Sequence, residues 1–253
     1  MERMREEGPC LIGFDLGWTL IDNPGRVAAY LAYLRARDLP LPSREQVERA
    51  FHLVDKRFMR EFPGVLGRHP STWLPWYLGM VNEELGLHID MTQQLRDLAG
   101  LRIDWELYPW TLPTLEELRR RGYPLVLVSN WGPDGRALVE RLGLAHYFRR
   151  IYISAEWGIE KPDPRLFRRV LLDAGVAGAG FLYVGDNYYD DVVGARSVGA
   201  KAVLLNRFDR LGVEEVNDCL VIHDLRQLLD LLPAPQGSAS DAPAPEAGQR
   251  EAG

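Results

Sequence analysis

Seven residues in four short motifs could together perform phosphoryl transfer. They are Asp15 in FDLGWTL, Ser129 and Asn130 in VLVSN, Lys161 in GIEKPDPRLF, and Asp186, Asp190 and Asp191 in VGDNYYDD. A carboxylate can attack the phosphorus of a dianionic ester only when nearby cations neutralise both groups. Such a site therefore needs a lysine, hydroxyl or amide donors, and hard oxygen ligands for Mg²⁺. The four motifs contain all of these groups.

Taken singly, each motif also has an ordinary structural explanation. An Asp at a strand end is more often a helix cap or turn residue than a nucleophile. Ser-Asn after a strand is typical of a turn, and Lys-Pro before a helix is a common entry. Their co-occurrence favours chemistry, because each motif falls at or just after the carboxyl end of a different predicted strand.

The elements that position these motifs alternate between strand and helix. The apolar runs CLIGFD, PLVLVSN, IYIS, FLYVGD and AVLLN are typical of buried parallel strands. The segments PDGRALVERLGL and PRLFRRVLLDAG lie between them and carry apolar residues at helical spacing. This order predicts an α/β fold with a doubly wound parallel sheet, in which chemistry is expected at the carboxyl ends of the strands.

One connection is too long for a simple crossover. From position 15 to position 129 the chain advances 114 residues (129 minus 15), whereas a strand, helix, strand unit needs about 30. Apolar residues in this stretch recur with a period near 3.6, which predicts helices. We therefore expect an α-helical cap domain at residues 25–104, inserted into a core domain formed by residues 1–24 and 105–232. Residues 233–253 are rich in Pro, Ala, Gly, Ser and charge and are expected to be a disordered tail.

Composition narrows the class of protein. The chain has 253 residues, of which 46% are hydrophobic, enough for a large core or a core with an insertion. No apolar run approaches the roughly 20 residues of a membrane helix, and the charged start MERMREEG does not resemble a signal segment. We therefore expect a cytoplasmic protein without membrane contact. The net charge of -6 argues against a nucleic-acid partner, so a small-molecule ligand is expected. No pattern indicates an oligomeric state.

As a set, the four motifs resemble those of haloacid dehalogenase-like hydrolases that carry a helical cap after the first strand. The resemblance covers roughly residues 10–206 and implies a Rossmann-like core. It implies that Asp15 is the nucleophile, that Lys161 bridges the nucleophile and the phosphate, and that the substrate is a phosphorylated small molecule. Ser129, Asn130 and Thr19 would bind the phosphoryl group. The Mg²⁺ ligands implied are Asp15, the backbone carbonyl of Gly17, Asp186 and Asp191, while Asp190 is expected outside the metal's immediate ligands.

The first motif departs from this family pattern. In the family's phosphatases it usually reads Asp-x-Asp-Gly-Thr, and the second Asp protonates the leaving alcohol and then activates water. In this chain Gly17 stands at that position, and Trp18 follows where Gly is usual. Because general acid-base assistance is worth about 10² to 10⁴ in rate, the loss is compatible with a slower enzyme or with substrates that have good leaving groups.

Three functions therefore remain open. A Mg²⁺-dependent phosphatase acting through an aspartyl-phosphate explains the acidic pair Asp186 and Asp191. A catalytically weakened binding protein would explain Gly17. A metal-independent 2-haloacid dehalogenase would use Asp15, Ser129 and Lys161, but resembles proteins that usually lack the first of the two acids. Trp18 and Trp131 adjoin motif residues and are expected at the entrance of the site, which favours a small or planar substrate.

Overall fold

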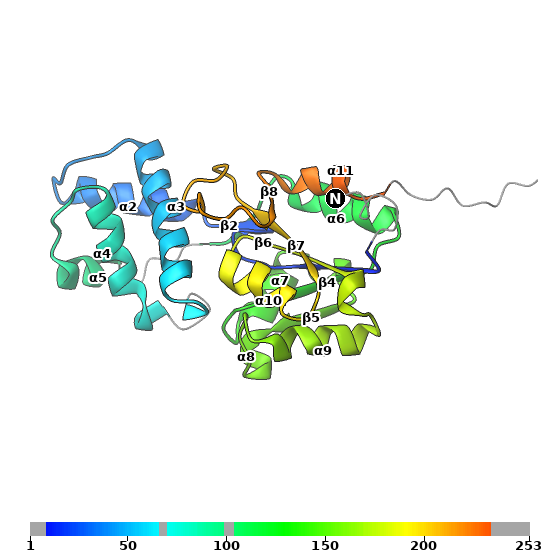
Figure 1. The fold of residues 1–253 in the computed structure, drawn as a ribbon. Helices are drawn as coiled ribbons and strands as arrows, with labels where there is room; N and C mark the ends of the chain where they lie inside the picture. The colour runs from blue at the N-terminus through cyan, green and yellow to red at the C-terminus, as the bar shows by residue number, and fades with distance from the viewer. Residues whose placement is uncertain (1–8, 66–69, 99–103, 234–253) are drawn as a thin grey trace, which may run out of the picture.

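The computed structural model describes residues 9–65, 70–98 and 104–233 of the chain. Figure 1 shows a helical lobe beside an α/β lobe. Apart from Pro233, the predicted tail at residues 233–253 lies outside the described residues, as do residues 66–69 and 99–103 of the predicted cap domain. Among the residues described, no helix combines the length and apolar character needed to cross a membrane.

The α/β lobe is built on a six-stranded parallel sheet with the order β5-β4-β1-β6-β7-β8. The strands are β1 (Leu11–Phe14), β4 (Leu125–Ser129), β5 (Arg150–Ile153), β6 (Phe181–Gly185), β7 (Lys201–Leu205) and β8 (Leu220–Ile222). The central strand β1 pairs with β4 on one side and with β6 on the other, for example Ile12 with Leu125 and Leu11 with Phe181. The predicted doubly wound α/β fold is confirmed, and β8 is a strand that the prediction did not include.

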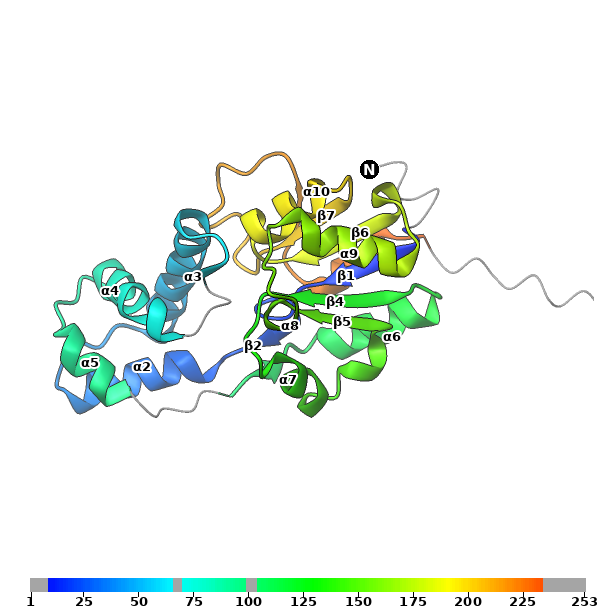
Figure 2. The same ribbon diagram turned by 90° about the horizontal axis from the view of Figure 1, so that it is seen from below.

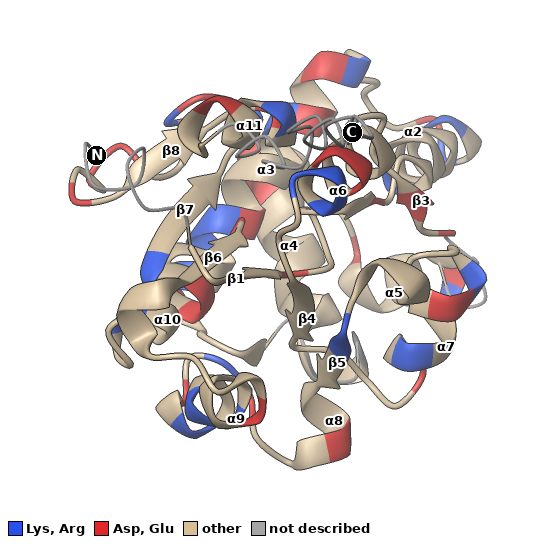
Figure 3. Cartoon of the chain, turned by 90° about the vertical axis from the view of Figure 1, so that its right-hand side faces the viewer, with Lys and Arg blue, Asp and Glu red and all other residues tan. Residues whose placement is uncertain are grey.

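Helices cover both faces of this sheet. They are α6 (Thr111–Arg120), α7 (Gly135–Arg141), α8 (Ser154–Trp157), α9 (Pro164–Ala174), α10 (Gly194–Arg196) and α11 (Leu228–Leu231), with short 3₁₀ turns η3 (Ala145–Tyr147), η4 (Gly178–Gly180) and η6 (Leu225–Gln227). Apolar residues of α6, α7 and α11 pack on one face, and those of α9 and α10 pack on the other. Positive and negative residues are interspersed along these outer helices, and neither sign dominates the face in Figure 3.

The second lobe consists of helices α2 (Gly25–Ala36), α3 (Arg44–Glu61), α4 (Leu74–Glu84) and α5 (Met91–Leu98), with the turn η2 (Pro70–Thr72). It has its own apolar core, in which Tyr30, Phe51 and Phe58 are buried. The longest helix, α3, begins at a capping box, because the Ser43 hydroxyl accepts from the Gln46 N–H while the Gln46 side chain accepts from the Ser43 N–H. Within the described part of residues 25–104, no strand joins the central sheet.

A short antiparallel ladder marks the place where the chain leaves and re-enters the α/β lobe. It consists of β2 (Ile21–Asp22) and β3 (Glu106–Leu107), and Figure 2 shows β2 at the junction of the two lobes. The N–H of Tyr108 also donates to the carbonyl of Leu20. The two segments that connect the lobes are therefore hydrogen-bonded to each other where the helical lobe begins.

Candidate active site

The candidate catalytic residues lie at neighbouring strand ends. Asp15 follows β1, Ser129 is the last residue of β4, and Asp186 follows β6. Because β4, β1 and β6 are adjacent and parallel, their carboxyl ends meet at one edge. The N–H of Asp15 donates to the carbonyl of Val184 at 2.9 Å, which holds the nucleophile candidate against β6.

Three buried carboxylates form a cluster at this edge. One oxygen from each of Asp15, Asp186 and Asp191 can be chosen so that all three lie within 4.8 Å of one another. Carboxylate oxygens at such spacing are a donor set that suits Mg²⁺. Gly17, whose carbonyl was expected as a further ligand, lies in the turn directly after Asp15.

Lys161 connects two of these carboxylates. Its Nζ donates to Asp15 Oδ1 at 2.7 Å, to Asp191 Oδ1 at 2.6 Å and to the Tyr183 hydroxyl at 3.0 Å. Burial alone would lower the pKa of Lys161, but attraction to Asp15 and Asp191 outweighs burial and raises the pKa well above its usual value. Lys161 is therefore a permanent ammonium that holds one oxygen of Asp15. Tyr183 was not identified from the sequence, because it lies inside an apolar strand and has the pattern of a core residue.

The acidic segment after β6 has an unusual backbone that places Asp191. Residues Tyr188–Val193 form one π-helical turn, η5, and the Asn187 side chain caps it by accepting from the N–H groups of Tyr189 and Asp190. The Asn187 N–H in turn donates to Asp191 Oδ2 at 2.9 Å. A Cβ at position 185 would lie 2.1 Å from Asp191 Oδ2, so the glycine before Asp186 is required for this close approach.

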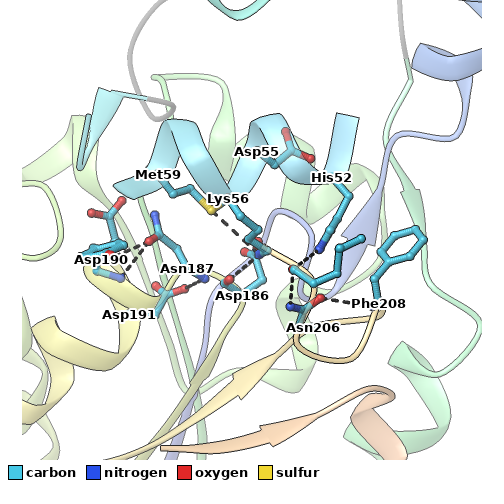
Figure 4. A network of polar contacts seen from close by, with 12 residues as sticks. His52, Asp55, Lys56, Met59, Asp186, Asn187, Asp190, Asp191, Asn206 and Phe208 are labelled. Atoms are coloured by element: carbon cyan, nitrogen blue, oxygen red, sulfur yellow. Dashed lines mark hydrogen bonds and ion pairs between the residues drawn. The ribbon is translucent and has the colours of Figure 1, made fainter. Parts of the chain in front are cut away.

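The structure adds a residue that sequence reasoning missed, Lys56 of helix α3. Its Nζ donates to Asp186 Oδ2 at 2.9 Å and to the Asp186 carbonyl at 2.5 Å (Figure 4). Helical periodicity could place Lys56 on a face of α3, but no local signal names a partner 130 residues away in the chain. The helical lobe thus contributes a buried cation to the acidic cluster.

The charges of this cluster fit a divalent cation. Burial is the main reason why the pKa of Asp186 rises to about 7, that of Asp190 to about 8 and that of Asp191 to about 6. A divalent cation bound beside Asp186 and Asp191 would favour the charged form of both carboxyl groups.

The residues expected around the phosphoryl group lie in different surroundings. Ser129 is buried at the end of β4, the strand that pairs with β1 just before Asp15. Asn130 binds the backbone of Lys161 at both groups, accepting from its N–H at 2.7 Å and donating to its carbonyl at 2.9 Å. Thr19 is fully buried, and its hydroxyl has no hydrogen-bond partner among the described residues. Asn130 thus fixes the backbone of Lys161, whose ammonium contacts Asp15.

Aromatic residues surround the turn after Asp15. The rings of Trp18 and Trp105 have centroids 4.8 Å apart, and those of Trp105 and Trp131 are 5.0 Å apart. The guanidinium of Arg26, on α2, lies 4.0 Å from the centroid of Trp18. All three tryptophans are partly exposed. A cluster of indole rings therefore occupies the space beside Gly17.

Comparison with known proteins agrees with this geometry. A family model described as haloacid dehalogenase-like hydrolase matches residues 11–199. The chain belongs to this family. A phosphoserine phosphatase of Thermus thermophilus is 45% identical over 141 residues, which are 54% of this chain and 57% of that protein. The match therefore spans little more than half of the relative's length.

Two solved structures from the same superfamily cover most of the chain. A HAD phosphatase from Thermococcus onnurineus is 26% identical with a TM-score of 0.55, and a 2-haloacid dehalogenase from Pseudomonas syringae is 31% identical with a TM-score of 0.51. Each alignment covers 87% of this chain and 96% of the other. Shared ancestry therefore includes both phosphatases and dehalogenases, and the choice between these activities depends on the residues of this site.

Proposed function

We propose that the protein is a Mg²⁺-dependent phosphatase that hydrolyses a small-molecule phosphomonoester through an aspartyl-phosphate on Asp15. The observation that carries the proposal is the pairing of Asp15 with Lys161 beside two further buried carboxylates, Asp186 and Asp191. The name of the Thermus relative, a phosphoserine phosphatase, supports the same reaction class. Residues 25–104 would act as the cap domain that selects the substrate.

The first step would transfer the phosphoryl group to the protein. One oxygen of Asp15 attacks phosphorus while Lys161 holds the other, and the bond from phosphorus to the ester oxygen breaks. Asp15, Asp186 and Asp191 would hold Mg²⁺, which when bound neutralises charge on the nucleophile and the phosphate. Lys161 and the hydroxyl of Ser129 would stabilise the phosphoryl oxygens. Water then attacks the acyl phosphate, which releases inorganic phosphate and restores Asp15.

Leaving-group protonation is the weak point of this chemistry. Gly17 provides no carboxylate, so an alkoxide would depart without a general acid from the first motif. Aryl and acyl phosphates need less protonation because their leaving groups are stable anions. We therefore propose that the protein favours small phosphate esters with such leaving groups, which matches an entrance formed by Trp18 and Trp131.

The acidic cluster also bears on the alternative activity. A 2-haloacid dehalogenase would need the nucleophile but no metal, so it would have no use for the two further buried carboxyl groups of Asp186 and Asp191 beside Asp15. For this reason we prefer phosphate esters over haloacids, although a solved dehalogenase is 31% identical to the chain.

A phosphate-release screen tests the proposal. The panel contains aryl, acyl, sugar and other small organic phosphates, with 2-chloropropionate as a separate substrate assayed for chloride release. We expect phosphate release that requires Mg²⁺ and disappears with chelator and in Asp15→Asn, because an amide is a poor nucleophile. Asp230→Asn is the control, since that side chain is exposed on α11. Chelator-resistant chloride release, or activity retained in Asp15→Asn, would contradict the proposal.

A further inference from the structure

Lys56 joins the helical lobe to the acidic cluster through an interaction that is fully enclosed. Its side chain and that of Asp186 are only 5% and 6% exposed. Two of the three ammonium N–H groups are directed to Asp186, and the third faces the Met59 sulfur at 3.9 Å. The stem packs against Gly212 of the α/β lobe, because a Cβ on Gly212 would lie 2.9 Å from the Cβ of Lys56. Lys56 therefore occupies a fixed place beside a candidate metal ligand.

Lys56 is the middle member of a stripe on α3 that faces the α/β lobe. His52, Lys56 and Arg60 are spaced four residues apart and so lie on one side of the helix. His52 Nε2 lies 2.9 Å from the Leu211 carbonyl, and Arg60 pairs with Glu215 at 3.2 Å. Both flanking interactions end on the loop after β7, whereas Lys56 reaches the acidic cluster (Figure 4).

The docked stripe leaves little room at the site. Asp15, Asp186 and Asp191 are each 8% exposed or less. A cavity beside Asp186, lined among others by Trp18, Lys56 and Arg207, has a volume of about 20 Å³, which suffices for about one water molecule. A phosphate ester is larger than that. Substrate could therefore not occupy this cavity beside Asp186 unless the helical lobe moved away.

We propose that Lys56 is a positioning residue that holds the Asp186 carboxylate while the helical lobe is docked, so that docking of the lobe and binding of Mg²⁺ oppose each other. This inference rests on the proposed metal-dependent function. In the docked state the ammonium already neutralises Asp186 and engages Oδ2. A divalent ion held by the same carboxylate would lie near a positive charge in a site with little water, and like charges repel strongly there.

The proposal predicts two effects that can be measured without turnover. Removing the ammonium in Lys56→Met should tighten Mg²⁺ binding by about tenfold or more, because the competing cation is gone. In the wild-type protein, Mg²⁺ should loosen the contact of α3 with the α/β lobe. Arg60→Met is the matched control, since Arg60 lies on the same stripe and pairs with the α/β lobe but does not touch the cluster.

The experiment combines calorimetric titration with Mg²⁺ and hydrogen-deuterium exchange of peptides covering α3. We expect tighter binding in Lys56→Met, wild-type affinity in Arg60→Met, and faster exchange in wild-type α3 when Mg²⁺ is added. The exchange measurement needs no variant, so it tests the proposal even if Lys56→Met does not fold. Unchanged or weaker binding in Lys56→Met, or slower or unchanged exchange in wild-type α3, would overturn this inference alone. Absence of Mg²⁺ binding by all three proteins would overturn the proposed metal dependence together with it.

Discussion

The variant Gly17→Asp would return a carboxylate to the position where family phosphatases carry their acid/base residue, and the structure limits how well it can act. The backbone at Gly17 is outside the left-handed region, so it tolerates a side chain. A Cβ there would lie 3.2 Å from Cζ3 of Trp131, closer than ordinary van der Waals contact. Trp131 has little freedom to retreat, because it packs tightly against Gly135 and Trp105. An aspartate at this position therefore requires Trp131 to shift by a few tenths of an ångström, and resistance to that shift would displace the new carboxylate.

The size of the effect follows from two opposing factors. A well-placed acid/base group is worth about 10² to 10⁴ in rate. A displacement of about 1 Å can cost about 10². Gly17→Asp alone is therefore expected to raise turnover of alkyl phosphates by about one- to a hundredfold. Trp131→Ala removes the obstructing ring. The double variant should therefore turn over alkyl phosphates about 10² to 10⁴ times faster than Trp131→Ala alone.

The assay is kcat/KM against leaving-group pKa at saturating Mg²⁺ for wild type, both single variants and the double variant. Gly17→Ala is the control, because it adds the same Cβ without an acid. A steep wild-type dependence should flatten in the double variant more than in Gly17→Asp. If Gly17→Asp gave the full gain in the presence of Trp131, the steric argument would be wrong. If the double variant gained nothing, position 17 would not direct a carboxylate at the leaving group.

Three further predictions concern the acidic cluster, and the first refers to metal-free protein. Burial raises the pKa of Asp190 to about 8, so the folded state keeps a proton that the unfolded chain releases near pH 4. The free energy of unfolding should therefore fall as pH rises from about 4 to 8, by at most about 6 kcal/mol. Asp190→Asn should flatten that fall in urea unfolding measured between pH 5 and 9. Gly185→Ala should displace Asp191, whose Oδ2 lies 2.1 Å from the new Cβ, and so break its contact with Lys161. Phosphatase activity should fall by about 10², while the far-UV circular dichroism spectrum stays unchanged. Mg²⁺ affinity measured by calorimetry should rise about tenfold from pH 6 to pH 8, because the metal binds the deprotonated form of Asp186, whose pKa burial raises to about 7. An affinity independent of pH would contradict that last assignment.

The sheet could be predicted because its strands are buried on both faces. Runs such as LVLVS and FLYVG are continuous and apolar, and only a covered parallel strand suits them. β8 was missed although LVI is apolar, because three residues with partial exposure give no clear period. The π-helical turn η5 was also missed, since its geometry depends on the side chain of Asn187 and on the close approach at Gly185.

Residues of the candidate site were predicted where they lie at a strand end, and missed where only tertiary packing brings them to the cluster. Asp15 and Asp186 could be found because parallel strands end at one edge. Lys56 and Tyr183 could not, because one lies on a polar helix and the other within an apolar strand, and only tertiary packing brings both to the cluster. The role of Asn130 as a clamp on the Lys161 backbone likewise depends on a loop 31 residues away.

The two departures in the first motif are linked by packing. Trp18 has a φ of 53°, in the left-handed region that glycine, the family's usual residue here, adopts without strain. A side chain in that region costs about 1 to 3 kcal/mol. Contact with Trp105 is worth about 0.5 to 1.5 kcal/mol, and the Arg26 guanidinium over the ring about 0.5 to 2 kcal/mol, so together they offset that cost. Gly17, with no Cβ, leaves the space that Trp131 fills.

This packing changes which side chains lie beside the proposed position of the leaving group. In place of a carboxylate that supplies a proton, the turn after Asp15 presents indole rings. The same rings connect the catalytic turn to α2 through Arg26, so the lobe that covers the site is attached at the position where the acid is missing. Indole rings can stack on a flat, weakly basic leaving group, but they cannot supply the proton that a departing alkoxide needs. Under the proposed mechanism, the substitutions at Gly17 and Trp18 would act together to restrict which esters react, while Asp15, Lys161 and the acidic cluster would remain available for those that do.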